Sequence, residues 1–361
     1  MHVRAKRKRF IRNELIYQDK YNELWEKFLT FAAFVNNLNN KLIMLLQILI
    51  LLVGLVLILM GANWLVDGSS SVARRFGISE FVIGLTIVGI GTSAPEMVVS
   101  FMSAFQGKSA MAVGNIVGSN IFNSLMILGV TALVAPLAIT KSNLRKDIPL
   151  NIIVTILLIL LGRSATMLGI GSTDSVSRLE GLLLLAIFGL YMWSTFRGEK
   201  ETKEESVENK IKPAMAALMI VGGLAGLIIG GRLFVNSATQ IAQIAGLSEK
   251  FIAITIMAAG TSLPELATCV VAAAKGQGQL ALGNVLGSNI SNILLILGGS
   301  ALINPLSFEG ITLMDLSLFA VAPVLIFLSS LTFKKKELDR VEGAIFVCLE
   351  IAYMALLITS I

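Results

Sequence analysis

The sequence has very little histidine, cysteine or charge. Its one histidine is His2, so nothing beyond the N-terminal tail can build a histidine-based zinc site or a Ser-His or Cys-His catalytic pair. Its two cysteines, Cys269 and Cys348, are isolated and imply no disulfide framework. We therefore expect neither an enzyme nor a resident cofactor.

What the chain has instead is apolar length. Hydrophobic residues make up 55% of the 361 residues and charged residues 14%, and the mean hydropathy is +0.81. These values exclude an ordinary soluble domain and predict an all-α polytopic membrane protein in contact with the lipid bilayer. Ten runs approach the length that crosses roughly 30 Å of hydrocarbon. They lie at 42–66, 81–105, 111–137, 148–162, 179–196, 213–235, 251–274, 280–306, 311–333 and 341–361.

The formal net charge of +6 does not indicate a nucleic-acid partner, because Lys and Arg lie mostly in the tail and loops rather than on one helix face. In a ten-helix chain the loops richest in Lys and Arg fall on one side of the membrane. The positive-inside rule predicts that this side is cytoplasmic, which places both termini outside a multi-pass protein of the cytoplasmic (inner) membrane.

The basic cluster at 4–12 contradicts that orientation, because it would have to cross the membrane. Two interpretations stay open for residues 1–41. They are an extension from an upstream start codon, with Met44 as the native start, or a cytoplasmic arm that requires an additional span. N-terminal mass analysis separates them.

An uncommon pattern occurs twice at a constant offset of 169 residues. Residues 91–96 (GTSAPE) and 114–123 (GNIVGSNIFN) return as 260–265 (GTSLPE) and 283–292 (GNVLGSNISN). Five crossings, an odd number, separate equivalent positions, so the second copy enters the membrane from the opposite side. The sequence thus predicts two inverted five-helix repeats, 42–196 and 213–361, joined by a charged cytoplasmic linker, 197–212. Many secondary transporters have this arrangement and bind their substrates where the repeats meet.

The first signature predicts a helix break inside the membrane. Pro95 lacks a backbone donor and its ring clashes with the carbonyl of Gly91, so the helix must kink or end there. Such a break is tolerated where it is buried or lines a wet cavity, and its carbonyls then become available to cations. Thr92 and Glu96 lie four residues apart on one helix face. Thr261 and Glu265 have the same spacing, with Pro264 between them.

The second signature predicts a polar stripe on each of two helices. Asn115, Ser119 and Asn123 recur every four residues, as do Asn284, Ser288 and Asn292. Interhelical hydrogen bonding and cation binding are both open for these side chains, whereas Gly114, Gly118, Gly283 and Gly287 indicate close helix packing.

Glu96 and Glu265 point more firmly to function, because an intramembrane carboxylate without a basic partner is costly. Together with hydroxyls, amide oxygens and carbonyls, they form an all-oxygen donor set. Calcium prefers about six to eight such ligands, and two carboxylates balance its charge. The same oxygens can hold sodium or protons, while magnesium, which needs near-octahedral geometry, fits less well.

The paired motifs resemble those of the calcium/cation antiporter superfamily, specifically its prokaryotic sodium/calcium exchanger type, from Leu42 to the C-terminus. The resemblance implies calcium ligands at Glu96 and Glu265, with Asn123 and Asn292 completing the centre. It implies that further oxygens for sodium come from Thr92, Ser93, Thr261, Ser262, Ser119 and Ser288 and from backbone carbonyls near Gly89 and Ala258. It also implies that the first and sixth helices slide past the others during transport.

Asn292 is the informative departure, because some relatives have an acid there that is associated with a potassium requirement. We therefore expect a potassium-independent antiporter that exchanges calcium for sodium by alternating access. A proton- or potassium-coupled exchanger is the alternative, and a calcium-permeable channel is a further one. Protein partners, stoichiometry and affinity do not follow from the sequence.

Overall fold

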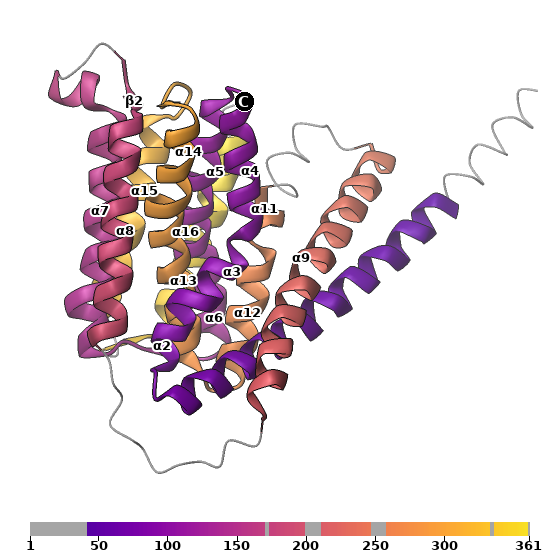
Figure 1. The fold of residues 1–361 in the computed structure, drawn as a ribbon. Coiled ribbons are helices and arrows are strands. Elements are labelled where there is room, and N and C mark those ends of the chain that lie inside the picture. The colour runs from indigo at the N-terminus through magenta and orange to yellow at the C-terminus, as the bar shows by residue number, and fades with distance from the viewer. Residues whose placement is uncertain (1–41, 170–172, 199–210, 247–257, 333–335, 360–361) are drawn as a thin grey trace, which may run out of the picture.

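The structure is a computed structural model, which describes residues 42–169, 173–198, 211–246, 258–332 and 336–359. These residues are almost entirely helical (Figure 1). The predicted extension, 1–41, and most of the predicted linker, 197–212, lie outside them, so both stay predictions.

The first half contains one long helix, Leu42–Phe76, and a series of shorter helical elements. They are α2 (Glu80–Ile83), η1 (Gly84–Val88), α3 (Gly89–Thr92), α4 (Ala94–Phe105), α5 (Ser109–Phe122), η2 (Asn123–Ile127), α6 (Leu128–Val134), η3 (Asn143–Asp147), α7 (Ile148–Gly162), η4 (Ser164–Leu168) and α8 (Arg178–Gly198), where η denotes a π-helix.

The second half follows the same order. Its helices are α9 (Pro213–Ile244), α11 (Ala258–Thr261), α12 (Leu263–Ala274), α13 (Gly278–Ser291), η6 (Asn292–Leu297), α14 (Gly298–Ile303), α15 (Leu313–Ser329) and α16 (Arg340–Thr359). The described residues also form four two-residue strands: β1 (Leu137–Ala138), β2 (Ser175–Val176), β3 (Leu306–Ser307) and β4 (Glu337–Leu338).

The predicted membrane fold is confirmed at the level of helical spans. Among the described residues, six helices are long and apolar enough to cross a membrane. A seventh span results if Glu80–Thr92 and Ala94–Phe105, which meet at 48°, count as one. Three predicted spans fall short of this test. Helices α7 and α15 have 15 and 17 residues, and the span predicted at 251–274 is described only from residue 258.

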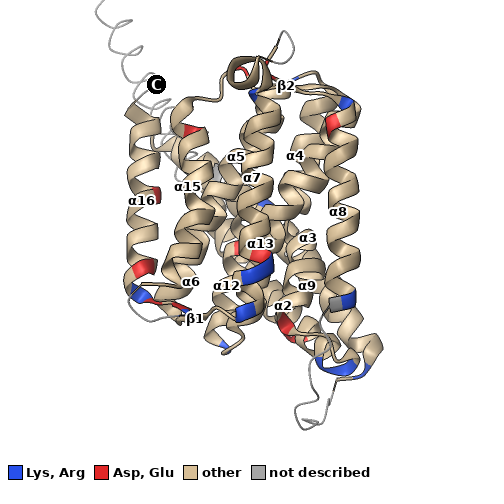
Figure 2. Ribbon diagram, turned by 90° about the vertical axis from the view of Figure 1, so that its left-hand side faces the viewer, with Lys and Arg blue, Asp and Glu red and all other residues tan. Residues whose placement is uncertain are grey.

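The two helical runs that carry the second signature form the centre of the molecule. The apolar stretch of Gly278–Ile303 is 94% buried and that of Ser109–Val134 is 72% buried, against 17% for Leu42–Phe76. Most Lys and Arg residues lie toward the two ends of the bundle (Figure 2). The signatures are therefore enclosed by protein, and the surrounding helices have the apolar exteriors that lipid requires.

Contacts between the halves recur at the offset of the sequence repeat. Strand β1 pairs with β4, and β3, which lies 169 residues after β1, pairs with β2. Similarly, a Cβ atom on Gly129 would lie 2.8 Å from the carbonyl oxygen of Gly343, and one on Gly298 would lie 3.1 Å from that of Gly181. The last helix of each half, α8 or α16, thus packs against the other half.

Helix Leu42–Phe76 and α9 cross through glycines. A Cβ atom on Gly61 would meet the carbonyl oxygen of Gly223 at 2.7 Å, and one on Gly54 would meet that of Gly230 at 2.8 Å. Gly223 is the repeat equivalent of Gly54, and Gly230 is that of Gly61, so the crossing is symmetric between the two helices. The two helices lean away from the remaining helices (Figure 1), and α9 contacts the bundle at α3, α11 and α12.

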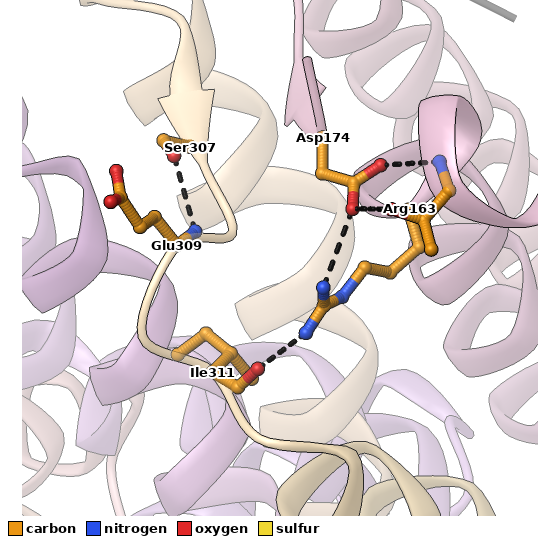
Figure 3. A network of polar contacts seen from close by, with 6 residues as sticks. Arg163, Asp174, Ser307, Glu309 and Ile311 are labelled. Atoms are coloured by element: carbon orange, nitrogen blue, oxygen red, sulfur yellow. Dashed lines mark hydrogen bonds and ion pairs between the residues drawn. The ribbon is translucent and has the colours of Figure 1, made fainter.

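A polar network around Arg163 and Asp174 connects loop segments next to α7 and α15 (Figure 3). The Arg163 guanidinium lies 3.3 Å from Asp174 Oδ2 and donates to the carbonyl of Ile311. Asp174 also accepts hydrogen bonds from the Thr166 amide, at 2.8 Å, and from its hydroxyl. The Thr166 hydrogen bonds, more than the nearby Arg163, lower the pKa of Asp174. The segment after α7 is therefore fastened to the segment that precedes α15.

Candidate cation site

Both copies of the first signature break their helix where the sequence predicts. Helix α3 ends at Thr92, Ser93 leaves helical geometry with φ −77° and ψ 9°, and α4 begins with Pro95 in its first turn. In the second copy, α12 likewise begins after Ser262, with Pro264 in its first turn. A proline costs little at this position, because first-turn amides have no partner within the helix.

Each break places a glutamate at the start of a helix. Glu96 lies in the first turn of α4 and Glu265 in the first turn of α12. The side chains are 1% and 0% exposed. A helix N-terminus stabilises a carboxylate through its dipole and free amides, but neither glutamate forms an ion pair with any basic residue that the structure describes. They are buried acids without a basic side-chain partner among the described residues.

The two glutamates are joined by a reciprocal pair of hydrogen bonds. Ser93 Oγ donates to Glu265 Oε1 at 3.1 Å, and Ser262 Oγ donates to Glu96 Oε1 at 3.2 Å. The serine of each signature thus donates a hydrogen bond to the glutamate of the other signature. The structure therefore brings together four of the predicted site residues, two from each half.

Four buried oxygens at the centre have no hydrogen-bond partner among the described residues. They are Glu96 Oε2, Glu265 Oε2, Asn123 Oδ1 and Asn292 Oδ1. They form two pairs at the 169-residue offset. A buried polar oxygen left unpaired typically costs about 1 to 3 kcal/mol, and more if it is charged. Two repeat-equivalent pairs of unpartnered oxygens are therefore candidate ligands for a bound cation.

The amide nitrogens of Asn123 and Asn292 are held by a second reciprocal pair. Asn123 Nδ2 donates to Asn289 Oδ1 at 3.2 Å, and Asn292 Nδ2 donates to Asn120 Oδ1 at 2.9 Å. With their nitrogens fixed in this way, Asn123 and Asn292 can offer only their oxygens to a ligand. Both signature asparagines open a π-helical turn, η2 and η6, a feature that is frequent at functional sites.

Asn120 and Asn289 are buried members of this hydrogen-bond network that the sequence analysis missed. Besides accepting the bonds above, Asn120 Nδ2 donates to the Asn289 carbonyl at 3.0 Å, and Asn289 Nδ2 donates to Ser124 Oγ at 2.8 Å. The available signal was their repetition as the third residue of each Gly-Ser-Asn triplet. We assign them to positioning, because they hold the asparagines that present free oxygens.

Of the remaining predicted residues, Thr92, Ser119, Ser288 and Gly89 are buried and Thr261 is partly buried. Thr92 Oγ1 lies 3.1 Å from Asn284 Oδ1 and 3.0 Å from the Val88 carbonyl, and Ser288 Oγ donates to the Gly89 carbonyl at 3.1 Å. Thr261 lies beside the Glu96 carboxyl, and Ser119 is 6% exposed on α5. Ala258 is the first residue of α11, and the structure describes its backbone but not its side chain.

The predicted polar stripes divide into different roles. Asn115 donates to the Glu96 carbonyl and to Ser100, and Asn284 Nδ2 lies 3.2 Å from Cys269 Sγ. Both act in interhelical hydrogen bonding, the first of the two interpretations. The last asparagine of each stripe keeps the free oxygen.

The predicted glycine packing is confirmed for the second copy. A Cβ atom on Gly283 or Gly287 would overlap the carbonyl oxygen of Phe81 or Leu85. For Gly114 and Gly118, the partners equivalent to Phe81 and Leu85 are residues 250 and 254, which lie outside the described ranges. The close packing brings α13 against α2, η1 and α3, the part of the first broken helix that precedes the break.

The fold and these oxygens define a multi-pass membrane protein whose two halves share a buried acidic centre. The family model described as sodium/calcium exchanger protein matches residues 46–197 and 215–359. The chain belongs to this family of membrane exchangers.

Individual relatives agree with the family. The sodium/calcium exchanger MaX1 of Methanosarcina acetivorans is 34% identical over 347 residues, which cover 86% of this chain and 97% of that protein. The inner membrane protein YrbG of Escherichia coli (strain K12) is 36% identical over 273 residues, 73% and 81% of the two chains. A solved structure of the sodium-calcium exchanger NCX_Mj superposes with a TM-score of 0.73 at 32% identity, covering 86% of this chain and 98% of that one.

Proposed function

We propose that this protein is a secondary active antiporter that exchanges calcium for sodium across the cytoplasmic membrane by alternating access. The observation that carries the proposal is the set of four unpartnered oxygens on Glu96, Glu265, Asn123 and Asn292. Two carboxylates and two amide oxygens are hard ligands of the kind calcium prefers, and two negative charges balance one calcium ion. Membership of the exchanger family supports the same conclusion.

The surrounding hydroxyls and carbonyls supply oxygens for sodium in this proposal. The set comprises Thr92, Ser93, Thr261, Ser262, Ser119 and Ser288 and the carbonyls of Gly89 and Ala258. A hydroxyl that donates its hydrogen still has lone pairs, so the bonds from Ser93 and Ser262 to the glutamates are compatible with cation binding. Because sodium and calcium share the glutamates, occupation by one ion excludes the other, which is what antiport requires.

The architecture proposed for this mechanism is ten spans in two inverted five-helix repeats, 42–196 and 213–361. The equivalent contacts at the 169-residue offset support it, as do the crossed glycines of Leu42–Phe76 and α9. We place the linker 197–212 on the cytoplasmic side. Sliding of the two leaning helices past the central helices exposes the site to each side in turn. Because the helix breaks at Pro95 and Pro264 occupy equivalent places in the two inverted halves, one mechanism can serve both the inward-facing and the outward-facing state.

Asn at both 123 and 292 leaves two formal charges in the centre, which favours sodium coupling without potassium. Proton or potassium coupling is the second candidate for the counterion. Isotopic calcium uptake into reconstituted liposomes, with sodium, potassium and pH gradients imposed one at a time, separates them. The proposal predicts accumulation of calcium against its own gradient when sodium alone is loaded inside. A channel conducts without such a countergradient, so calcium that only equilibrates contradicts antiport.

A further inference from the structure

A further buried carboxylate, that of Glu350, lies outside the centre described above. Glu350, in α16, is 1% exposed, and its Oε2 atom has no hydrogen-bond partner among the described residues. An acidic side chain within a membrane span is expensive and usually marks a binding or transfer site. Glu350 takes no part in the hydrogen bonds of Glu96 and Glu265, so the exchange site as built so far does not explain it.

The packing of α16 fixes the depth at which Glu350 lies. Helix α16 packs on α6 and η2, and its buried face contains Gly343, Phe346 and Glu350. The two runs are antiparallel and meet where Gly343 touches Gly129. Counted from this contact, Glu350 lies seven residues along α16 and Asn123 lies six residues back along the facing run, so the two residues lie at a similar depth.

Two unpartnered oxygens therefore lie on adjoining elements at one depth. One is Glu350 Oε2 and the other is Asn123 Oδ1, from the first residue of η2. No residue of 123–134, the part of the chain that α16 packs on, is ionisable. The titratable groups nearby are Tyr353, one turn along α16, and Asp315 of α15, which accepts a hydrogen bond from the Tyr353 hydroxyl at 2.7 Å. No positive charge in the described elements balances Glu350.

The repeat architecture does not require an acid at this position. Strands β2 and β4 occupy equivalent places in the two halves, and so do Gly181 and Gly343. Both comparisons relate α8 to α16 by an offset of 162 residues. The position equivalent to Glu350 is therefore 188, where the chain has Phe188, a side chain packed on the core. The carboxylate breaks the symmetry of the two halves, which is expected of a function that only one half performs.

We propose that Glu350 is a peripheral sodium site, in which its carboxylate binds one monovalent cation beside Asn123. The charge of one carboxylate matches one such ion, and the oxygens at hand are ligands that sodium accepts. Asn123 then lies between the peripheral and the central site and can couple their occupancies. The inference rests on the proposed sodium/calcium exchange for its role in transport, although binding itself does not.

The transport test uses E350Q, which keeps the shape of the side chain and removes its charge. Calcium uptake into liposomes is measured against internal sodium at fixed calcium, and then against calcium at fixed sodium. We expect the half-saturating sodium concentration to rise roughly three- to tenfold, with a lower sodium Hill coefficient and an unchanged calcium KM. E309Q, which changes an exposed loop acid, is the matched control and should leave both curves in place.

A binding test remains informative if transport fails. Sodium chloride, compared with choline chloride, should raise the unfolding temperature of the purified E96Q/E265Q variant, and adding E350Q should remove that residual shift. The proposed function fails, and this site stands, if the wild type does not exchange ions but the residual sodium shift depends on Glu350. An unchanged sodium curve in E350Q, an equal loss of sodium and calcium affinity, or a changed pH profile alone would overturn the sodium site.

Discussion

The Ser93 hydroxyl donates a hydrogen bond to Glu265, a residue of the opposite signature 172 positions along the chain, at 3.1 Å. Its equivalent, from Ser262 to Glu96, has nearly the same length. These bonds fix one oxygen of each glutamate and leave the other free. Each repeat thus orients the acid of the other, so neither half has a complete site alone.

Replacing Ser93 by alanine should weaken ion binding without unfolding the protein. A hydrogen bond to a charged group contributes about 1.5 to 3 kcal/mol, so we expect roughly a tenfold or greater increase in the half-saturating calcium concentration. S262A should have a similar effect, because its bond is equivalent. Calcium titrations of uptake by both variants measure this. A large effect in one variant and none in the other contradicts the symmetric centre.

Filling the glycine crossing should slow transport while sparing binding. In G61A or G223A the new methyl carbon would lie 2.7 Å from a backbone atom of the opposite helix, and overpacking of this kind typically costs about 1 to 3 kcal/mol. We expect a several-fold lower uptake rate with calcium-dependent thermal stabilisation retained. G231A is the control on the same helix, because no described atom lies within 4 Å of its Cβ position. Equal rates in all three variants would argue against movement at this crossing.

The ion pair between Lys275 and Asp67, 2.7 Å apart, joins the loop after α12 to the first helix. Both side chains are partly exposed, at 30% and 43%, so the pair should add only about 0 to 1 kcal/mol to stability. Its larger effect should be on helix movement. We expect D67N to alter the uptake rate with little change in unfolding temperature, and the charge swap D67K/K275D to restore the rate. Failure of the swap assigns the effect to something other than this pair.

The pH dependence of the Asp174 network has a definite sign. The folded-state pKa of Asp174 lies below its usual 3.8 because of the Thr166 hydrogen bonds. Its contribution to stability is therefore present above the unfolded pKa and is lost as pH falls through the lower, folded value. Wild type should lose stability relative to D174N only below about pH 4. Thermal unfolding of both proteins between neutral pH and pH 3 measures the difference, and a gap that grows as pH rises above 5 contradicts it.

The sequence predicts the parts of the site that depend on local chemistry. Pro95 and Pro264 lack an amide hydrogen, which favours a helix break just before them, and the following glutamate then lies in a first turn. The interleaving of Asn120, Asn123, Asn289 and Asn292 was not predictable in the same way. Whether an asparagine pairs with its neighbour's nitrogen, oxygen or carbonyl depends on the register of two helices from different halves.

The sequence analysis also failed to predict the lengths of some helices and the burial of Glu350. A hydropathy run merges an apolar helix with the loops and turns around it, so the run predicted at 311–333 corresponds to a helix of only 17 residues, α15. Glu350 belongs to no repeated motif, because the equivalent position holds Phe188. Only the packing of α16 against α6 and η2 reveals that its carboxylate is buried.

The most direct test of the central claim is sodium-driven calcium accumulation in liposomes containing wild type, E96Q or E265Q. Each substitution keeps the side-chain shape and removes one of the two charges that balance calcium. Uptake should be abolished in both variants, with wild-type expression and a folded protein by thermal unfolding. Full accumulation in either variant would contradict a shared pair of glutamates as the calcium site.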